Sequence, residues 1–257
     1  MSRTAGTAAA PPPLLRRLAA EALGTGLLVA VVVGSGIQAA QLSHDAGVQL
    51  LANSLATVLG LAVLITLLGP VSGAHFNPAV TLAVTLADRF TGRRDGTGPT
   101  WREAAAYVPA QVAGAIGGAV LADAMFGKPL VRFSAQDRFA GHLWLGEAVA
   151  TAGLILLVLG LGRIGRTALA PAAVASYIGA AYWFTSSTGF ANPAVTVGRA
   201  FTDTFAGIAP ASVAPFIAAQ LLGAALGLGV VAVVYGRSSA ATHVVVVPHG
   251  EPEVAPT

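Results

Sequence analysis

Asn77-Pro78-Ala79-Val80-Thr81 is the string on which the fold depends, because the same five residues return as Asn192-Pro193-Ala194-Val195-Thr196. Each copy follows a long apolar segment and opens a short one, so the repetition extends to the surrounding hydropathy pattern. Internal repetition of this kind indicates a duplicated structural unit, and in membrane proteins the two units often have opposite orientations. The sequence therefore predicts two related halves, each built around one Asn-Pro-Ala motif.

The composition is that of a membrane protein. Hydrophobic residues make up 55% of the 257 residues and charged residues only 10%, whereas soluble domains average about 25% charged residues. The chain has no cysteine, which excludes disulfides, thiolate metal sites and cysteine nucleophiles. Six apolar segments have about the 20 residues that cross a bilayer core; they are residues 14–40, 48–69, 104–125, 143–161, 168–186 and 210–235.

The basic residues lie in short segments between the apolar runs. A net charge of +3 and a pI of 9.8 would suit a nucleic-acid partner, but the charges do not gather on one face, so we expect no such partner. With the N-terminus inside, ten arginines fall on the inner side and four basic residues on the outer side. The positive-inside rule then predicts a multi-pass protein of the cell (inner or plasma) membrane with both termini in the cytoplasm.

The membrane domain is predicted to span residues 14–235, with the two repeats at about 14–125 and 143–235. The flanking segments 1–13 and 236–257 are polar and contain several prolines, so we expect disordered tails.

Two further strings support the duplication. The first span of each half contains E-x-x-x-T, beginning at Glu21 and at Glu147, and the third span contains Q-x-x-G-A, beginning at Gln111 and at Gln220. Because each half contains three spans, the second half must enter the membrane inverted relative to the first. The third spans also contain G-x-x-x-G steps at residues 114–118 and 223–227, which favour close helix packing.

Each Asn-Pro-Ala motif opens an apolar stretch, about 77–87 and 192–201, that is too short to cross a bilayer. Pro78 and Pro193 suit the first helical position, and the asparagines before them suit the N-cap. We therefore predict an all-α membrane protein with six transmembrane helices plus two re-entrant half-helices in an inverted repeat. The half-helix N-termini are expected to meet near the middle of the membrane.

Glu21 and Glu147 lie inside predicted spans, where a carboxylate needs a partner. Backbone N–H groups of the re-entrant loops 70–76 and 187–191 are natural donors, which predicts a loop-supporting role for both glutamates. Proton coupling is the functional alternative. His75 lies in the first loop, where it either supports that loop through a hydrogen bond or serves as a pH gate.

These features resemble the aquaporin family of water and small-solute channels. The resemblance covers residues 14–235, including both E-x-x-x-T strings, Ser-Gly-Ala-His-Phe-Asn-Pro-Ala at 72–79 and the second motif. It implies a homotetramer of independent pores that conduct water and small neutral solutes, with no cofactor, no metal and no catalytic residues, and so no enzyme activity. The implied pore residues are the asparagines Asn77 and Asn192 and the rest of their motifs, Pro78, Ala79, Pro193 and Ala194.

Val195 departs from the family pattern, because most members have an arginine immediately after the second motif. The remaining selectivity-filter positions, counted from the asparagines, are Thr57, Ala180 and Gly189. All four residues are small or apolar, so we expect a wider, less polar and uncharged constriction. Arg199, one helical turn beyond Val195, is open to two interpretations: a solvated or loop-bonded side chain, or one that reaches back toward the filter.

The segment 180–196 is similar to a bacterial aquaporin branch associated with arsenic resistance, in which valine replaces that arginine. The resemblance implies arsenite-type metalloid hydroxides, glycerol-like polyols and water as solutes, because neutral arsenite is a tri-hydroxyl molecule similar in bulk to glycerol. A water-selective channel, a proton-coupled secondary transporter and a packing or adhesion protein with a closed pore are the alternatives.

Overall fold

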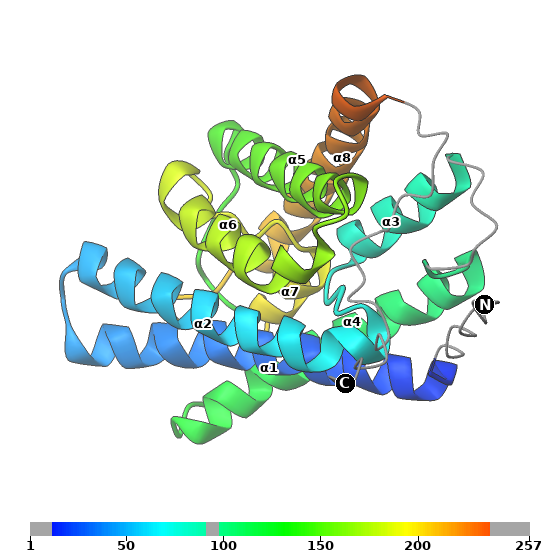
Figure 1. The fold of residues 1–257 in the computed structure, drawn as a ribbon. Coiled ribbons are helices and arrows are strands. Elements are labelled where there is room, and N and C mark those ends of the chain that lie inside the picture. The colour runs from blue at the N-terminus through cyan, green and yellow to red at the C-terminus, as the bar shows by residue number, and fades with distance from the viewer. Residues whose placement is uncertain (1–11, 91–97, 237–257) are drawn as a thin grey trace, which may run out of the picture.

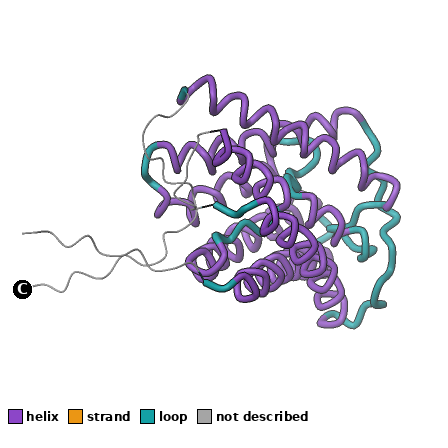
Figure 2. The backbone as a smooth tube through the Cα atoms, turned by 90° about the vertical axis from the view of Figure 1, so that its right-hand side faces the viewer, coloured by secondary structure: helices purple, strands orange, loops and turns teal. Residues whose placement is uncertain are grey.

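The computed structural model describes residues 12–90 and 98–236, and within these ranges every regular element is a helix (Figure 2). The elements are α1 (Leu14–Leu42), α2 (Ala46–Ser72), α3 (Pro78–Phe90), α4 (Trp101–Met125), α5 (Gly141–Arg163), η1 (Thr167–Leu169), α6 (Ala170–Phe184), α7 (Pro193–Arg199) and α8 (Pro210–Tyr235). The predicted all-α membrane fold is confirmed. The tails predicted to be disordered, 1–13 and 236–257, lie almost entirely outside the described residues.

Five of the predicted spans are helices long and apolar enough to cross a bilayer: α1, α2, α4, α5 and α8. The sixth, predicted at 168–186, is α6, which has only 15 residues and follows the short turn η1. At 1.5 Å per residue α6 is about 22 Å long, compared with about 30 Å for a bilayer core. The helix ends early because Thr185 has extended backbone angles (φ −107°, ψ 142°) and leads into the second re-entrant loop.

The two halves pack in the same way. α1 lies along α4 in the first half and α5 along α8 in the second, while α2 contacts α6 across the two halves (Figure 1). A Cβ atom on Gly118 would lie 2.0 Å from the Gly26 carbonyl oxygen, and one on Gly227 would lie 2.6 Å from that of Ala152. Glycine therefore allows backbone-to-backbone contact at equivalent places in both halves, as the G-x-x-x-G steps predicted.

The half-helices α3 and α7 begin at Pro78 and Pro193, as predicted, and have 13 and 7 residues. α3 continues past the predicted end at 87 to Phe90, whereas α7 ends at Arg199 rather than 201. α7 is shorter because the chain tightens directly after it. The N–H of Phe201 donates to the Gly198 carbonyl three residues back, at 3.1 Å, and the chain then turns away.

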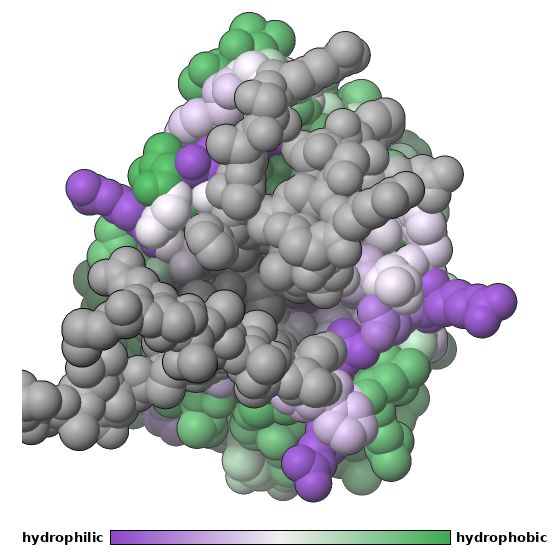
Figure 3. All heavy atoms as spheres, turned by 45° about the vertical axis from the view of Figure 1, so that its right-hand side comes forward, coloured by the Kyte–Doolittle hydropathy of each residue, from purple (hydrophilic) through white to green (hydrophobic). Residues whose placement is uncertain are grey.

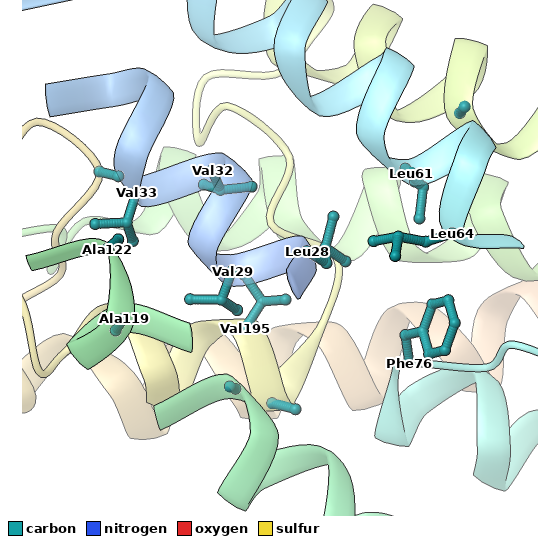
Figure 4. Close-up of a cluster of buried hydrophobic side chains, with 14 of the residues drawn as sticks. Leu28, Val29, Val32, Val33, Leu61, Leu64, Phe76, Ala119, Ala122 and Val195 are labelled. Carbon is teal, nitrogen blue, oxygen red and sulfur yellow. The ribbon is translucent and has the colours of Figure 1, made fainter. Parts of the chain in front are cut away.

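Apolar side chains form both the interior and much of the exterior. One cluster joins α1, α2, α4 and the start of α7, and includes Leu28, Val32, Leu61, Ala119 and Val195 (Figure 4). On the outside, α2 exposes apolar residues at every fourth position, namely Leu51, Leu55, Leu59, Val63 and Leu67. Hydrophobic residues also lie along the periphery of the face shown in Figure 3. A helix that is apolar on both its inner and outer faces is typical of a membrane span.

Candidate functional site

The two Asn-Pro-Ala motifs meet through their asparagine side chains. The Nδ2 atom of Asn77 donates to the Ala191 carbonyl at 2.7 Å, and the Nδ2 atom of Asn192 donates to the Phe76 carbonyl at 2.8 Å. Each asparagine thus binds the loop that precedes the other motif. Residues 77 and 192, separated by a long stretch of sequence, are therefore close together, and both are buried.

Each asparagine also caps its own half-helix. The Oδ1 atom of Asn77 accepts from the Ala79 N–H at 2.9 Å, and that of Asn192 accepts from the Ala194 N–H at 3.0 Å. A carboxamide has two N–H donors, and the bond to the opposite loop uses one of them. Because Asn77 and Asn192 both line the central cavity, the second N–H of each is available to a solute there.

The two re-entrant loops repeat the same unusual backbone conformation. Phe76 and Ala191, which precede the asparagines, have φ angles of 47° and 49°, and the corresponding pair Ala74 and Gly189 have 48° and 56°. Left-handed angles are uncommon outside glycine and cost of order 1–3 kcal/mol each. At Phe76 and Ala191 this conformation occurs at the residues whose carbonyls accept from the opposite asparagine.

Glu21 is fully buried and its carboxylate holds the first loop. Its Oε1 atom accepts from Ser72 Oγ at 2.6 Å and from the His75 N–H at 3.0 Å. Its Oε2 atom accepts from the Phe76 N–H and from Gln111 Nε2, both at 2.7 Å. Four donors therefore converge on two oxygens, and they join α1, α4 and the loop.

Glu147 repeats this arrangement in the second half. It accepts from the N–H groups of Phe190 and Ala191 at 2.8 and 2.9 Å and from Gln220 Nε2 at 2.6 Å. Gln111 and Gln220 were not among the predicted site residues. The repeated Q-x-x-G-A string marked them, because duplicated polar residues inside an apolar span need a common explanation.

His75 is held by Thr81. The Thr81 hydroxyl donates to the Asn77 carbonyl at 3.0 Å, accepts from Gln111 Nε2 at 3.0 Å and lies 3.1 Å from His75 Nδ1. With the one hydroxyl proton directed at the Asn77 carbonyl, this contact needs the tautomer of His75 that carries its proton on Nδ1. The ring also packs edge-on against Tyr107, with centroids 5.7 Å apart. This geometry supports the loop-bonded interpretation of His75.

A cavity passes both asparagines and is lined by residues of both halves. Its walls are mainly apolar and include Leu28, Leu61, Ile65, Leu154, Val158, Val174 and Ile178. Polar side chains on it are few, namely Thr57, His75, Asn77, Tyr182, Asn192 and Arg199. A solute in this cavity meets hydrogen-bonding groups at a small number of places between apolar surfaces.

Three of the four predicted filter residues, Thr57, Gly189 and Val195, line the cavity. Ala180 does not: it is exposed on the outside of α6, and the structure corrects this prediction. The cause is helical periodicity, because a residue two positions from an inward-facing one points away from the cavity.

Tyr182, and not Ala180, is the α6 residue whose side chain lines the cavity near Thr57. It is buried, it lines the cavity together with Ile178 one turn earlier, and its hydroxyl lies 3.1 Å from Thr57 Oγ1. The Thr57 proton is directed at the Asn53 carbonyl, 2.8 Å away, so Tyr182 is the donor in their contact. Sequence reasoning missed Tyr182, and its only signal was the i, i+4 spacing from Ile178.

Arg199 adds a charge that the four predicted filter residues lack. Its side chain is 4% exposed and lines the cavity. Its Nε donates to the Ala206 carbonyl, and its Cζ lies 3.4 Å from the centroid of the Phe190 ring, a cation–π contact. The cavity wall as a whole is therefore not uncharged. Arg199 is loop-bonded, as one interpretation held, and it also reaches the cavity.

The loop between α4 and α5 closes over the same end of the molecule. Arg138 in this loop donates from Nε to the Gly207 carbonyl at 3.1 Å, and its Cζ lies 5.1 Å from the Phe190 ring centroid. Burial lowers the pKa of Arg138 below its usual value, and the negative charge of Glu147 opposes this shift. Nothing in the sequence pattern marked Arg138.

Known proteins share this architecture. Aquaglyceroporin AqpS of Rhizobium meliloti is 53% identical over 215 residues, which cover 84% of this chain and 88% of that protein. A glycerol uptake facilitator protein of Pseudomonas aeruginosa is 32% identical over 263 residues, covering 87% and 90%. The X-ray structure of the aquaglyceroporin from Plasmodium falciparum has the same fold, with a TM-score of 0.61 over 86% of this chain and 97% of that one at 20% identity.

The family itself follows from a match along most of the chain. A family model described as major intrinsic protein matches residues 9–185, which contain the first motif, its half-helix and all elements from α1 to α6. The second motif lies beyond this match and repeats the first in sequence and in its contacts. The chain belongs to the major intrinsic protein family, that of the aquaporins.

Proposed function

We propose that this protein is a passive transmembrane channel for small uncharged solutes: glycerol-like polyols, arsenite-type metalloid hydroxides and water. The observation that carries the proposal is the pair of asparagine amides. Asn77 and Asn192 line one apolar-walled cavity, and each has an N–H that no acceptor in the described chain uses. A hydroxyl-bearing solute that loses its water shell finds these donors on an otherwise apolar cavity wall.

The meeting of two helix N-termini supports exclusion of cations. α3 and α7 both start directly after the asparagines, and each helix N-terminus carries roughly half a positive charge. Protons and metal cations therefore meet a repulsive potential where neutral solutes meet hydrogen-bond donors. Such a channel needs no energy source, and flux follows the concentration gradient.

The size of the preferred solute is inferred from Val195 and from the relatives. A valine leaves more room at the cavity wall than an arginine would, and two relatives are described as an aquaglyceroporin and a glycerol uptake facilitator. Arsenite is included because its neutral tri-hydroxyl form matches glycerol in bulk and in hydrogen-bonding groups.

Stopped-flow light scattering on proteoliposomes tests the proposal, with protein-free liposomes as the control. We expect faster water flux, glycerol entry and arsenite entry in vesicles that contain the protein. Water flux with complete exclusion of both larger solutes would instead indicate a water-selective channel. No flux of any kind in correctly inserted protein would indicate a closed packing protein.

A proton-coupled transporter is the alternative that depends on the buried glutamates. The donors that surround Glu21 and Glu147 support a structural role for both carboxylates. The test is accumulation: glycerol or arsenite concentrated inside vesicles against its gradient when a pH gradient is applied would favour coupling, whereas strictly downhill flux favours the channel.

We further propose a homotetramer in the cell membrane with both termini in the cytoplasm, and no enzyme activity. The exposed apolar stripe on α2 suits lipid or a neighbouring copy, and the basic residues favour the inside orientation. Native mass spectrometry tests the tetramer. Protease access to terminal tags in right-side-out and inverted vesicles tests the orientation.

Val195→Arg is expected to reduce glycerol and arsenite flux about tenfold, which corresponds to an added barrier of about 1.4 kcal/mol, and to reduce water flux much less. The added guanidinium narrows the cavity at the wall that Val195 forms beside Arg199. Val195→Leu is the matched control, because it adds bulk without charge. Equal losses of water and glycerol flux in Val195→Arg would mean that residue 195 does not set the width of the passage.

A further inference from the structure

Arg199 is the one charged residue that lines the cavity within the described ranges 12–90 and 98–236. It ends α7, four residues after Val195, which places its Cα about 6 Å further along the helix axis. Residues at this spacing share a helix face, and both line the cavity. The guanidinium therefore belongs to the same wall as Val195, on the side away from the asparagines.

The direct contacts that hold the guanidinium are with neutral groups. Its Nε donates to the neutral Ala206 carbonyl and its Cζ lies over the neutral Phe190 ring. The ion pair described at this end of the molecule joins Arg132 and Asp203, at 3.3 Å, and does not include Arg199. A cation in a wall of low dielectric projects a strong positive potential into the passage beside it.

The guanidinium also keeps donors for a solute. Of the five N–H donors of an arginine, the Nε–H alone has an acceptor in the described part of the chain. The two terminal nitrogens are not among the buried unpartnered atoms, so they reach the accessible surface. Their planar fork matches two oxygens of one partner, which suits a polyol or a metalloid hydroxide.

We propose that Arg199 is the residue that determines charge selectivity and orients solutes in this channel. Its guanidinium repels protons and other cations at the constriction and donates to passing hydroxyl groups. Val195 then determines the width of the passage, and Arg199, one turn further along α7, provides its charge. This inference rests on the channel function proposed above.

The experiment compares wild-type protein with Arg199→Gln, Arg199→Met and Arg199→Lys in proteoliposomes. Arg132→Gln is the matched control, because its side chain is 65% exposed and does not line the cavity. Light scattering reports water and glycerol flux. A trapped pH-sensitive dye reports proton leak under a potassium diffusion potential.

The neutral variants Arg199→Gln and Arg199→Met are expected to raise proton leak per channel about tenfold or more. They should also lower the ratio of glycerol to water flux about threefold, the effect of one lost hydrogen bond. Arg199→Lys keeps the positive charge but loses the planar pair of N–H donors. We therefore expect it to keep proton leak low and to lower the ratio of glycerol to water flux. Arg132→Gln should match the wild type in both measurements.

A folded Arg199→Gln protein with wild-type leak and a wild-type flux ratio would overturn this inference and leave the channel function intact. Absence of glycerol flux in the wild type would overturn both. If neither neutral variant can be recovered in folded form, phenylglyoxal labelling of arginines in the wild-type protein tests the inference instead. Labelling of Arg199 that glycerol slows supports the inference, and labelling of Arg132 without Arg199 contradicts it.

Discussion

Glu21→Gln is expected to lower the free energy of unfolding by about 3–5 kcal/mol, the loss of two buried hydrogen bonds to a charged group. The carboxylate accepts from four donors, two of them backbone N–H groups of the first re-entrant loop. Glutamine replaces one acceptor oxygen with an NH2 group, so at least one buried loop N–H then faces another donor. Two residues of this loop, Ala74 and Phe76, have strained left-handed backbone angles. Fewer hydrogen bonds would then hold them in that conformation.

The equivalent change in the second half should be milder. Glu147 accepts three hydrogen bonds of 2.9 Å or less and has a weaker contact with the Ser187 hydroxyl, so Glu147→Gln is expected to cost about 2–3 kcal/mol. Glu103→Gln is the control: Glu103 pairs with Arg17 at a partly exposed site, where the two side chains are 23% and 13% exposed, and ion pairs near the surface contribute about 1 kcal/mol or less. From most to least stable, the three variants are therefore expected to rank Glu103→Gln, Glu147→Gln and Glu21→Gln.

Thermal unfolding in detergent and the yield of monodisperse protein measure this order. Selectivity in the surviving fraction should be unchanged, because neither glutamate lines the cavity in the described residues. Wild-type stability together with altered solute selectivity or altered proton flux would contradict the loop-supporting role and revive the transport role of these carboxylates.

Gly118→Ala is expected to destabilise the protein by about 3 kcal/mol or more, at the upper end of overpacking effects. A Cβ at this position would lie 2.0 Å from the Gly26 carbonyl oxygen. The obstructing atom belongs to the backbone of α1, so no side-chain rotation relieves the clash and the two helices must separate. Separation of α1 from α4 also displaces Gln111 from Glu21.

Gly117→Ala is the matched control, one residue away on the same helix. A Cβ at Gly117 would have no neighbour within 4 Å, and this residue is exposed. Alanine has a higher helix propensity than glycine by about 1 kcal/mol, so Gly117→Ala should be neutral or slightly stabilising. Similar melting temperatures for the two variants would show that α1 and α4 are not in backbone contact.

The parts of the site that depend on local sequence were predictable. Asn77 and Asn192 precede prolines, and an asparagine followed by proline at a helix start favours a capped N-terminus whatever surrounds it. The pairing of Glu21 and Glu147 with loop N–H groups followed from the cost of a lone carboxylate inside a membrane. The same argument could have predicted Gln111 and Gln220 as partners of the glutamates, because their Q-x-x-G-A string is also repeated.

Ala180 and Arg199 show where reasoning along the chain failed. Counting from the asparagines placed Ala180 at the constriction, but rotation of α6 about its axis turns Tyr182 inward instead. Small residues at the filter predicted an uncharged passage, yet a longer side chain from the next turn of α7 reaches the same wall.

The sequence by itself determined the type and order of the elements, the duplication, the inverted arrangement and the meeting of two capped half-helices. These follow from hydropathy, helix capping and the number of spans in each half, which are properties of contiguous residues. Tertiary structure alone decided which α6 side chain faces the cavity and which charge remains there. The rotation of a helix and the reach of an arginine depend on partners distant in the chain: Thr57 for Tyr182, and Phe190 and Ala206 for Arg199.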